Sequence, residues 1–367
     1  MLQAAERPRR QEIRLRHGLG IGTGKYNAFG RAARTLWLVA LGVPLALSAQ
    51  MQPEGSTCTT QSAMSGDLRQ SLADTALALA SAVKANDSSR VQAMSAPDIA
   101  SNFDASAYII HQTSAAIGTD TLRVAQLYRL DATARKAGDT SEADFACLLS
   151  GSTGEVDFAI PGLPPGVYAF AIVDAEGDRP WMLPMLLEQQ GSAWKMAGFY
   201  PHARTAAGHD GLWYWTTARA DVKAGKKWLA WVLYGQADQL LRPANFITST
   251  HLEQLRTERR NDAPGELSEG ITAETPLVLK SKDGAEFRLT QLGSAAATDG
   301  KSLDLVLHYT ADSNADTNAA RTRNTAAAAA LLNAHPELRE GFSGVSVFSE
   351  VAGQSPFITE QSLADVH

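Results

Sequence analysis

The residues of this chain best suited to acid–base chemistry are His209 and Asp210, in the segment Gly-His-Asp-Gly just before a tryptophan-rich stretch. A histidine next to a carboxylate can act as a general base. Adjacent residues rarely present their side chains to each other, so catalysis would need a third partner. The competing interpretation is structural: Asp210 caps the following helix and His209 bonds to loop backbone. We favour the structural interpretation.

Two further residues of catalytic type, Asp157 and Tyr168, lie in segments that read as strands. Asp157 alternates with apolar Phe158, so its default position is the solvent face of a strand. Nothing in the spacing selects either residue as a catalyst. The chain contains no H-E-x-x-H, no G-x-S-x-G and no carboxylate cluster with calcium-loop spacing. The sequence therefore leaves catalysis uncertain and favours a protein without catalytic activity, metal or cofactor.

The tryptophans are concentrated in one region. Four of the seven lie close together: Trp213, Trp215, Trp228 and Trp231. Such a set can stack against a sugar or a peptide, which makes these residues candidates for ligand binding. An aromatic hairpin packed on a sheet is more often part of a core, because each ring buries a large apolar area. Both interpretations remain open.

The amino-terminal segment differs in charge from the rest of the chain. Residues 1–49 carry a net charge of +6 within a chain of net charge −6, so the remainder is acidic. An acidic surface repels phosphate backbones, which argues against nucleic-acid binding. The apolar run 35–49 is typical of a secretory signal peptide cleaved near Ala49. It is too short and too broken by proline and glycine for a membrane span, although an uncleaved anchor is the alternative. We expect a periplasmic or extracellular protein with no membrane span after cleavage.

The chain has two cysteines, Cys58 and Cys147. An even number in an exported protein favours a disulfide bond, and two unpaired buried thiols are the alternative. Two cysteines without a nearby histidine pair do not make a zinc site.

The first half of the chain predicts helices followed by an antiparallel sheet. Apolar residues recur at helical spacing from Leu68 to Val83. Alternating or fully apolar runs separated by proline and glycine then indicate strands joined by turns. The predicted strands are Thr121–Leu130, Phe145–Leu149, Val156–Ile160, Val167–Val173, Trp181–Glu188 and Trp194–Tyr200. We interpret the last four as a meander in which Val156–Ile160 pairs with Val167–Val173.

Three features of residues 66–200 occur together: the helix ending Lys84-Ala-Asn-Asp87, the two paired strands, and a closing strand that begins Gly191-Ser-Ala-Trp. In this order they resemble the cone-shaped fold of the nuclear-transport-factor-two-like, or SnoaL-like, superfamily. The resemblance implies a pocket between helices and sheet, where an Asp, His or Tyr acts on a small hydrophobic molecule. The Pro-Gly-Leu-Pro-Pro-Gly turn is similar instead to hairpins of transthyretin-like modules, so a β-sandwich remains open. The whole chain also resembles secreted bacterial proteins, which implies no activity.

Residues 201–262 predict a hairpin of two helices, broken at Gly225, followed by a short polar helix. Its small and aromatic residues are spaced similarly to those of one tetratricopeptide unit: Ala218, Gly225, Ala230, Tyr234 and Ala237. A single unit of this kind cannot bury its own apolar face. We therefore expect the hairpin to pack onto the sheet domain.

The carboxy-terminal region predicts a small β-β-β-α-β unit. Its alanine-rich helix, Ala319–Ala334, should stop before Pro336, because proline disfavours helix in the residue preceding it. The fold class is thus α+β, with helices on a curved antiparallel sheet, then an α-hairpin, then this unit. The predicted divisions are signal peptide 1–49, linker 50–65, SnoaL-like domain 66–200, hairpin region 201–262 and carboxy-terminal unit 263–367.

Three functional hypotheses follow. The first is an exported, non-catalytic binding or assembly protein for an unknown protein or a small hydrophobic ligand. The second is a SnoaL-like enzyme that uses acid–base chemistry on a small hydrophobic molecule. The third is a scaffold that holds a partner protein through the helical hairpin. A filled space between helices and sheet favours the first, whereas a hollow one with a buried, unpaired Asp or His favours the second.

Overall fold

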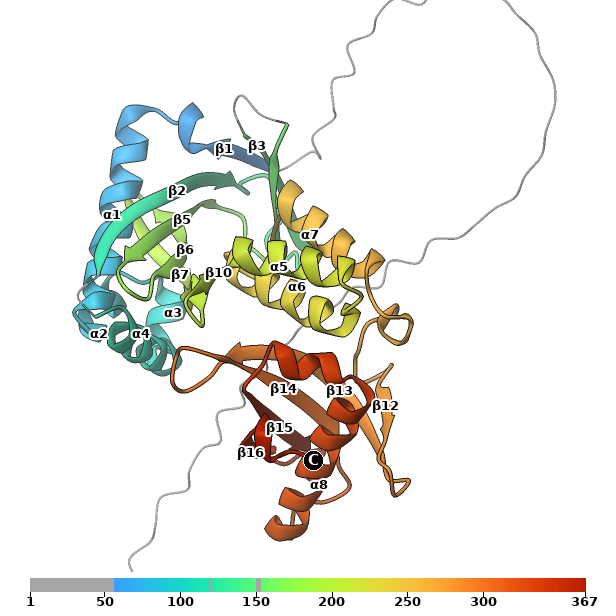
Figure 1. The fold of residues 1–367 in the computed structure, drawn as a ribbon. Helices are drawn as coiled ribbons and strands as arrows, with labels where there is room; N and C mark the ends of the chain where they lie inside the picture. Colours follow the sequence, from blue (N-terminus) through green and yellow to red (C-terminus); the bar gives the residue numbers. More distant parts are fainter. Residues whose placement is uncertain (1–55, 119, 150–152) are drawn as a thin grey trace, which may run out of the picture. The chain divides into compact units, whose positions relative to one another are not determined.

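The computed structural model describes residues 56–118, 120–149 and 153–367. The predicted signal peptide and residues 50–55 of the predicted linker lie outside these residues. The rest of the predicted linker is described and contains the strand Thr57–Thr60. All of these described residues belong to one compact unit. It has the predicted α+β fold (Figure 1). The further division at residues 200 and 262 stays a prediction.

Four helices cover one face of the larger amino-terminal sheet. They are α1 (Gly66–Lys84), α2 (Ser88–Ala93), α3 (Pro97–Ser101) and α4 (Asp104–Ile117). Side-chain oxygens cap two of them: Ser65 accepts from the Leu68 N–H, and Asp87 accepts from the Arg90 N–H. The apolar stripe predicted on the first helix faces the sheet, and Leu72 and Leu79 in it are fully buried. Helical periodicity therefore identified the surface that packs.

The sheet under these helices is antiparallel. Its strands are β1 (Thr57–Thr60), β2 (Thr121–Asp131), β5 (Val167–Glu176), β6 (Trp181–Gln190) and β7 (Ala193–Phe199), in the order β1-β2-β5-β6-β7, with β8 (His202–Ala203) paired to β6. The central strand β5 is buried over most of its length on both faces. One face meets the helices and the other meets a second, smaller sheet, so the region has three layers.

The smaller sheet corrects the predicted strand pairing. It contains β3 (Glu142–Leu148), β4 (Glu155–Pro161) and β11 (Ile247–Ser249), in the order β11-β4-β3. The expected pairing of Val156–Ile160 with Val167–Val173 is wrong, because β4 pairs with β3 and β11. Residues 162–166, which connect β4 to β5, carry the chain from the smaller sheet to the larger one. The two strands instead pack face to face: Phe158 contacts Phe170 edge-on, with ring centroids 5.4 Å apart.

A disulfide joins the two sheets. Cys58 on β1 is bonded to Cys147 on β3, with Cα atoms 5.3 Å apart. The predicted bridge is thus confirmed. Disulfides persist in oxidising compartments, so the bond is in keeping with a protein that functions outside the cytosol.

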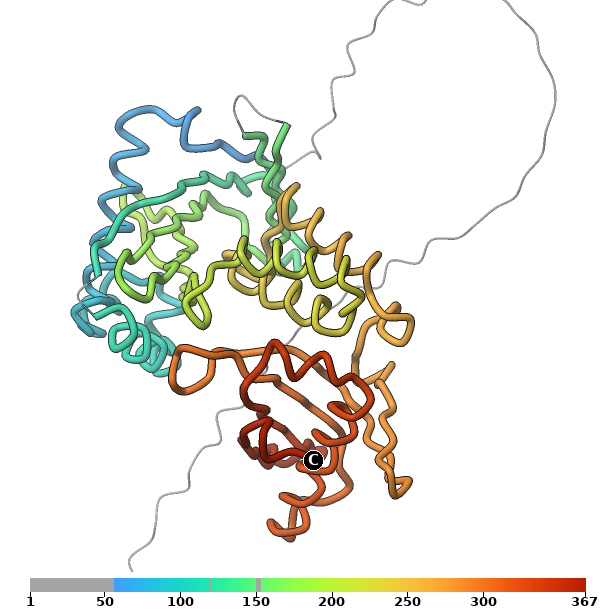
Figure 2. Tube along the Cα trace, in the orientation of Figure 1, coloured from blue at the N-terminus to red at the C-terminus, as the bar shows by residue number. Residues whose placement is uncertain are grey.

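The predicted helical hairpin is present. It consists of α5 (Gly211–Lys223) and α6 (Lys227–Leu241), and α7 (Thr250–Asn261) packs beside α6. We expected the hairpin to pack onto the amino-terminal sheet domain, and this expectation is wrong, because it packs onto the carboxy-terminal sheet instead. The buried side chains of α6 form one cluster with those of the carboxy-terminal sheet. Figures 1 and 2 show that sheet next to the hairpin. The apolar face of the hairpin needed a neighbour, and the later part of the chain supplies it.

The carboxy-terminal sheet has the order β12-β13-β14-β15-β16. Its elements are β12 (Leu277–Lys280), β13 (Glu286–Ala296), β14 (Leu303–Thr310), α8 (Thr317–Ala334), β15 (Gly344–Glu350) and β16 (Phe357–Ser362). Helix α8 connects the parallel strands β14 and β15 and ends before Pro336, as predicted. The edge strand β16 was not predicted. Buried Asn324 ties helix to sheet through bonds with Tyr309 and Thr359.

Candidate functional site

A short β-ribbon positions the residues just before α5. Strand β9 (Thr205–Ala206) pairs with β10 (His209–Asp210) across the two-residue turn Ala207–Gly208. Both turn residues have positive φ, 49° and 79°, as two-residue hairpin turns of the type I′ geometry require. Asp210 then accepts a 2.8 Å hydrogen bond from the Trp213 N–H and caps α5. The structural interpretation of Asp210 is therefore confirmed.

His209 stacks on Trp213 instead of bonding to loop backbone. The two ring centroids are 3.7 Å apart and the rings are nearly parallel. Tyr214 contacts Trp213 edge-on, and its hydroxyl donates a 2.6 Å bond to the Ala206 carbonyl. Burial raises the pKa of Tyr214 to about 12, so this hydroxyl stays protonated at neutral pH. The cap, the ribbon and this bond hold the aromatic group in one arrangement.

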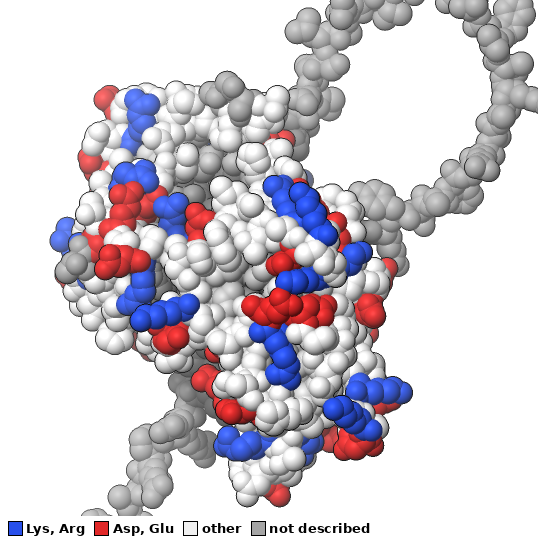
Figure 3. Space-filling model, viewed as in Figure 1, with Lys and Arg blue, Asp and Glu red and all other residues white. Residues whose placement is uncertain are grey.

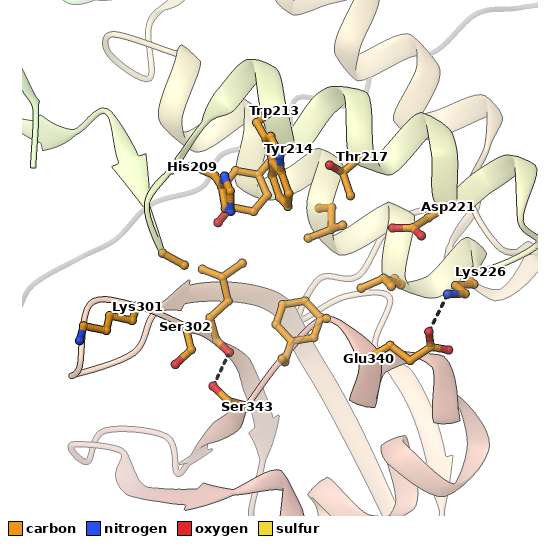
Figure 4. Close-up of a pocket in the computed structure, with 16 residues that line it drawn as sticks. His209, Trp213, Tyr214, Thr217, Asp221, Lys226, Lys301, Ser302, Glu340 and Ser343 are labelled. Carbon is orange, nitrogen blue, oxygen red and sulfur yellow. Dashed lines mark hydrogen bonds and ion pairs between the residues drawn. The ribbon is translucent and has the colours of Figure 1, made fainter.

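The aromatic group borders a cleft of about 520 Å³ between the hairpin and the carboxy-terminal unit (Figure 4). This volume is within the range of small-molecule sites. Apolar side chains of α6 and the carboxy-terminal unit line its inner wall, among them Leu229, Leu233 and Phe342. Ser343 and the segment 301–303 line the side opposite α5. The cleft therefore combines apolar side chains with a comparable share of polar and charged ones.

Charged groups lie at the end of the cleft away from His209 (Figure 4). Lys226 forms a 2.6 Å ion pair with Glu340. That bond raises the pKa of Lys226, so the amine stays charged. Asp221 lies at the same end, and its pKa is raised mainly by burial, with Lys226 opposing the shift and Glu340 adding to it. The three groups carry a net negative charge when all are ionised.

Three of the four tryptophan candidates belong to the core. Trp215, Trp228 and Trp231 are all less than a tenth exposed, whereas Trp213 is 43% exposed. The Trp215 indole donates a 2.7 Å bond to Glu258. Trp228 stacks on His335, and the Arg259 guanidinium lies over Trp231. Among these four, Trp213 alone lines the cleft, together with His209.

The structure does not bring Asp157 and Tyr168 to the cleft. Tyr168 packs between the two amino-terminal sheets, where its hydroxyl donates to the Pro164 carbonyl, and burial raises its pKa to about 12. Asp157 is half-buried on β4, and burial, followed by the charges of Glu155 and Glu253, raises its pKa. Neither residue lines the cleft that contains His209.

Sequence reasoning missed Asp221, Lys226 and Glu340. A signal existed for the first, because Trp213, Thr217 and Asp221 follow one another at a spacing of four on a helix and so share a face. No local pattern marks Glu340, which is 114 residues from Lys226.

The described residues contain no group of three or more His, Cys, Asp or Glu side chains that could hold a metal ion. No helix among them is long and apolar enough to cross a membrane. On the face shown in Figure 3, Lys and Arg are interspersed with Asp and Glu. A basic surface for nucleic acid is therefore not seen on that face.

Comparisons of the chain with family models, curated proteins and solved structures found no match. The resemblance to the SnoaL-like superfamily and to tetratricopeptide units stays a prediction.

Proposed function

We propose that this protein is an exported, non-catalytic binding protein whose cleft beside α5 receives a small ligand with a large apolar part. The observation that carries the proposal is the exposed indole of Trp213, stacked on His209 at one end of a cleft of about 520 Å³ whose lining includes the apolar side chains of Leu229, Leu233 and Phe342. An exposed aromatic ring at a pocket offers a large contact area at a low cost in conformational entropy.

Export is supported by the Cys58–Cys147 disulfide and by the predicted signal peptide. Amino-terminal sequencing of the protein recovered from the periplasm or the medium tests it. We expect the mature chain to start near residue 50. A chain that begins at Met1 in the cytosolic fraction would contradict export without affecting the binding proposal.

Two observations favour this function over its rivals. Trp194, Phe103 and Leu79 are buried between the helices and the six-stranded sheet, which leaves little room there for the substrate of a SnoaL-like enzyme. On the hairpin, burial of Trp215, Trp228 and Trp231 removes most of the aromatic surface that a scaffold would offer a partner protein.

The test is a screen of small aromatic and aliphatic compounds by ligand-observed NMR on the disulfide-bonded protein. Trp213→Ala removes the exposed ring, and Leu212→Ala is the matched control, because Leu212 is the adjacent residue, is 59% exposed and does not line the cleft. We expect binding to weaken at least about tenfold in the first variant and to persist in the second. Binding that is equal in both variants, or no binding at all, would overturn the proposal.

A further inference from the structure

The side of the cleft formed by α5 has a defined length. Trp213, Thr217 and Asp221 lie on one helix face, and all three line the cleft (Figure 4). At a rise of 1.5 Å per residue, Asp221 is about 12 Å along the helix from Trp213. The aromatic pair and the carboxylate are thus opposite ends of one elongated site.

The two ends differ in charge. Lys301 lies at the same end as His209, whereas Asp221, Lys226 and Glu340 lie at the other (Figure 4). Lys226 is already paired with Glu340 at 2.6 Å. Within the described part of the chain, the Asp221 carboxylate has no hydrogen bond or ion pair of its own. The Asp221 end therefore carries a net charge of −1 when Asp221, Lys226 and Glu340 are all ionised, because one ammonium group lies near two carboxylates.

An unpaired, half-buried carboxylate has lost part of its hydration without gaining a partner. Burial raises the pKa of Asp221, as expected for such a group. A cationic ligand group placed next to it would supply the missing partner, and an anionic group would be repelled. The apolar walls formed by Leu229, Leu233 and Phe342 would meanwhile cover an uncharged body.

We propose that the cleft selects an amine, with a protonated amino group against Asp221 and an apolar or aromatic group about 12 Å away against the His209–Trp213 pair. This inference rests on the proposed binding function and adds the class of ligand. Two sources share the chemistry: a long-chain free amine, or the amino terminus of a short peptide. An extended peptide rises about 3.3–3.6 Å per residue, so about four residues span the site.

Isothermal titration calorimetry with three probes of matched chemistry tests the inference. 8-Phenyloctylamine has the charge and the length, 8-phenyloctan-1-ol has the length alone, and 2-phenylethylamine has the charge alone. We expect the first to bind at least about tenfold tighter than the alcohol, as one charge-assisted contact provides. We expect it to bind at least about tenfold tighter than the short amine too, because the short amine cannot reach both ends and buries less apolar area. The peptide Ala-Ala-Ala-Phe amide, compared with its N-acetylated form, shows whether a peptide amino terminus serves as the amine.

Asp221→Asn should remove the advantage of the amine over the alcohol, measured as the ratio of their two affinities. Asp98→Asn is the matched control, because Asp98 is exposed on α3 and does not line the cleft. In the unmodified protein, amine affinity should also fall as the pH drops through the Asp221 pKa, which lies above its usual value, whereas alcohol affinity should stay constant.

The outcomes separate the two proposals. If the alcohol binds as tightly as the amine, or if Asp221→Asn leaves the difference intact, selection of amines is wrong while the binding function stands. If none of these probes binds and the wider compound screen also finds no ligand, the binding function fails and the inference fails with it.

Discussion

Helices pack on a sheet in two places in this protein, and the two interfaces differ in how completely they are filled. Between α1–α4 and the six-stranded sheet, large apolar side chains such as Leu79, Met185 and Trp194 are buried. Between the hairpin and the carboxy-terminal unit, α6 packs closely, but α5 borders a cleft of about 520 Å³.

The difference comes from the residues placed at each interface. In the closed one, the inward positions of α1 are leucine, alanine and valine. In the open one, α5 directs Thr217 and Asp221 toward the carboxy-terminal unit. A carboxylate cannot fill an apolar space without a large desolvation cost, so solvent-accessible volume remains beside it. The free space beside α5 thus follows from polar residues on an inward helix face.

The strongest test of the closed interface is Trp194→Ala. The ring is 6% exposed within the cluster between helices and sheet, so its removal should cost about 3–5 kcal/mol of unfolding free energy. Urea denaturation measures this cost, with Trp213→Ala, which should cost far less, as the comparison at the open interface. An unchanged unfolding midpoint for Trp194→Ala would mean that the Trp194 ring is not packed between the helices and the sheet.

The disulfide should make the next largest contribution to the free energy of unfolding, and it joins the two sheets beside the closed interface. Replacing both cysteines by alanine should cost about 2–4 kcal/mol, chiefly by releasing a loop closed over a sequence separation of 89 residues. Thermal unfolding of the variant, compared with the chemically reduced wild type, should give similar losses. A reduced protein as stable as the oxidised one would contradict the prediction.

At the open interface, Gly341→Ala should cost about 1–3 kcal/mol by overpacking. A Cβ at this position would overlap the Cδ1 atom of Leu229, which is 4% exposed. The φ of Gly341 is −104°, so backbone strain plays no part. Gly265→Ala is the control, because its Cβ would meet no atom within 4 Å. Equal unfolding midpoints for the two variants would show that the α6 contact is looser than described.

The outer side of the hairpin should make stability depend on pH. The hydrogen bond from Arg219, supported by those from Trp215 and Gln254, lowers the pKa of Glu258 to about 2. Because the pKa of Glu258 is lower in the folded than in the unfolded chain, its ionised form stabilises the fold at pH values above the unfolded-state pKa. This stabilisation is lost as the pH falls from about 5 to 2. We expect about 1–2 kcal/mol, since Arg219 is 41% exposed and solvent screens the pair.

Glu258→Gln isolates that contribution. Unfolding free energies of the variant and the wild type should differ at pH 6 and converge toward pH 2. A constant difference across this range would indicate that packing, and not ionisation, accounts for the role of Glu258.

The smallest effect is expected for His209→Ala, which removes one exposed ring stacked on Trp213 and should cost no more than about 1 kcal/mol. Circular dichroism and thermal unfolding measure it. The same variant should weaken ligand binding at the cleft. A collapse in folding yield would show instead that His209 is part of a structural network.

Local patterns in the sequence were sufficient for most elements. Apolar spacing located α1, and the spacing of small and aromatic residues around the break at Gly225 indicated α5 and α6. Asp210 indicated the start of α5, and Pro336 the end of α8. The edge strand β16 was missed because Phe357–Ser362 has little apolar alternation and is held by its pairing with β15. The partner of β4 was predicted incorrectly as β5, the next strand in the sequence, whereas β4 pairs with β3 and β11. Strands adjacent in sequence need not pair, because the chain can cross from one sheet layer to the other between them.

The candidate site was predictable only in part. His209 and Trp213 attracted attention by residue type, and both line the cleft. The burial of Trp215, Trp228 and Trp231 was one of two open interpretations, and composition alone could not choose between them. Glu340 had no signal at all, because its relation to Lys226 exists only once the hairpin and the carboxy-terminal unit have packed.

The sequence by itself determined the helices and most strands, and it favoured the capping of α5 and the pairing of the only two cysteines, because each depends on neighbouring residues or on a choice with few alternatives. The tertiary structure alone decided which sheet the hairpin covers, and therefore where an aromatic pair and an unpaired carboxylate come to share one cleft. That choice depends on which distant apolar surfaces bury each other most completely, and short-range periodicity carries no information about it.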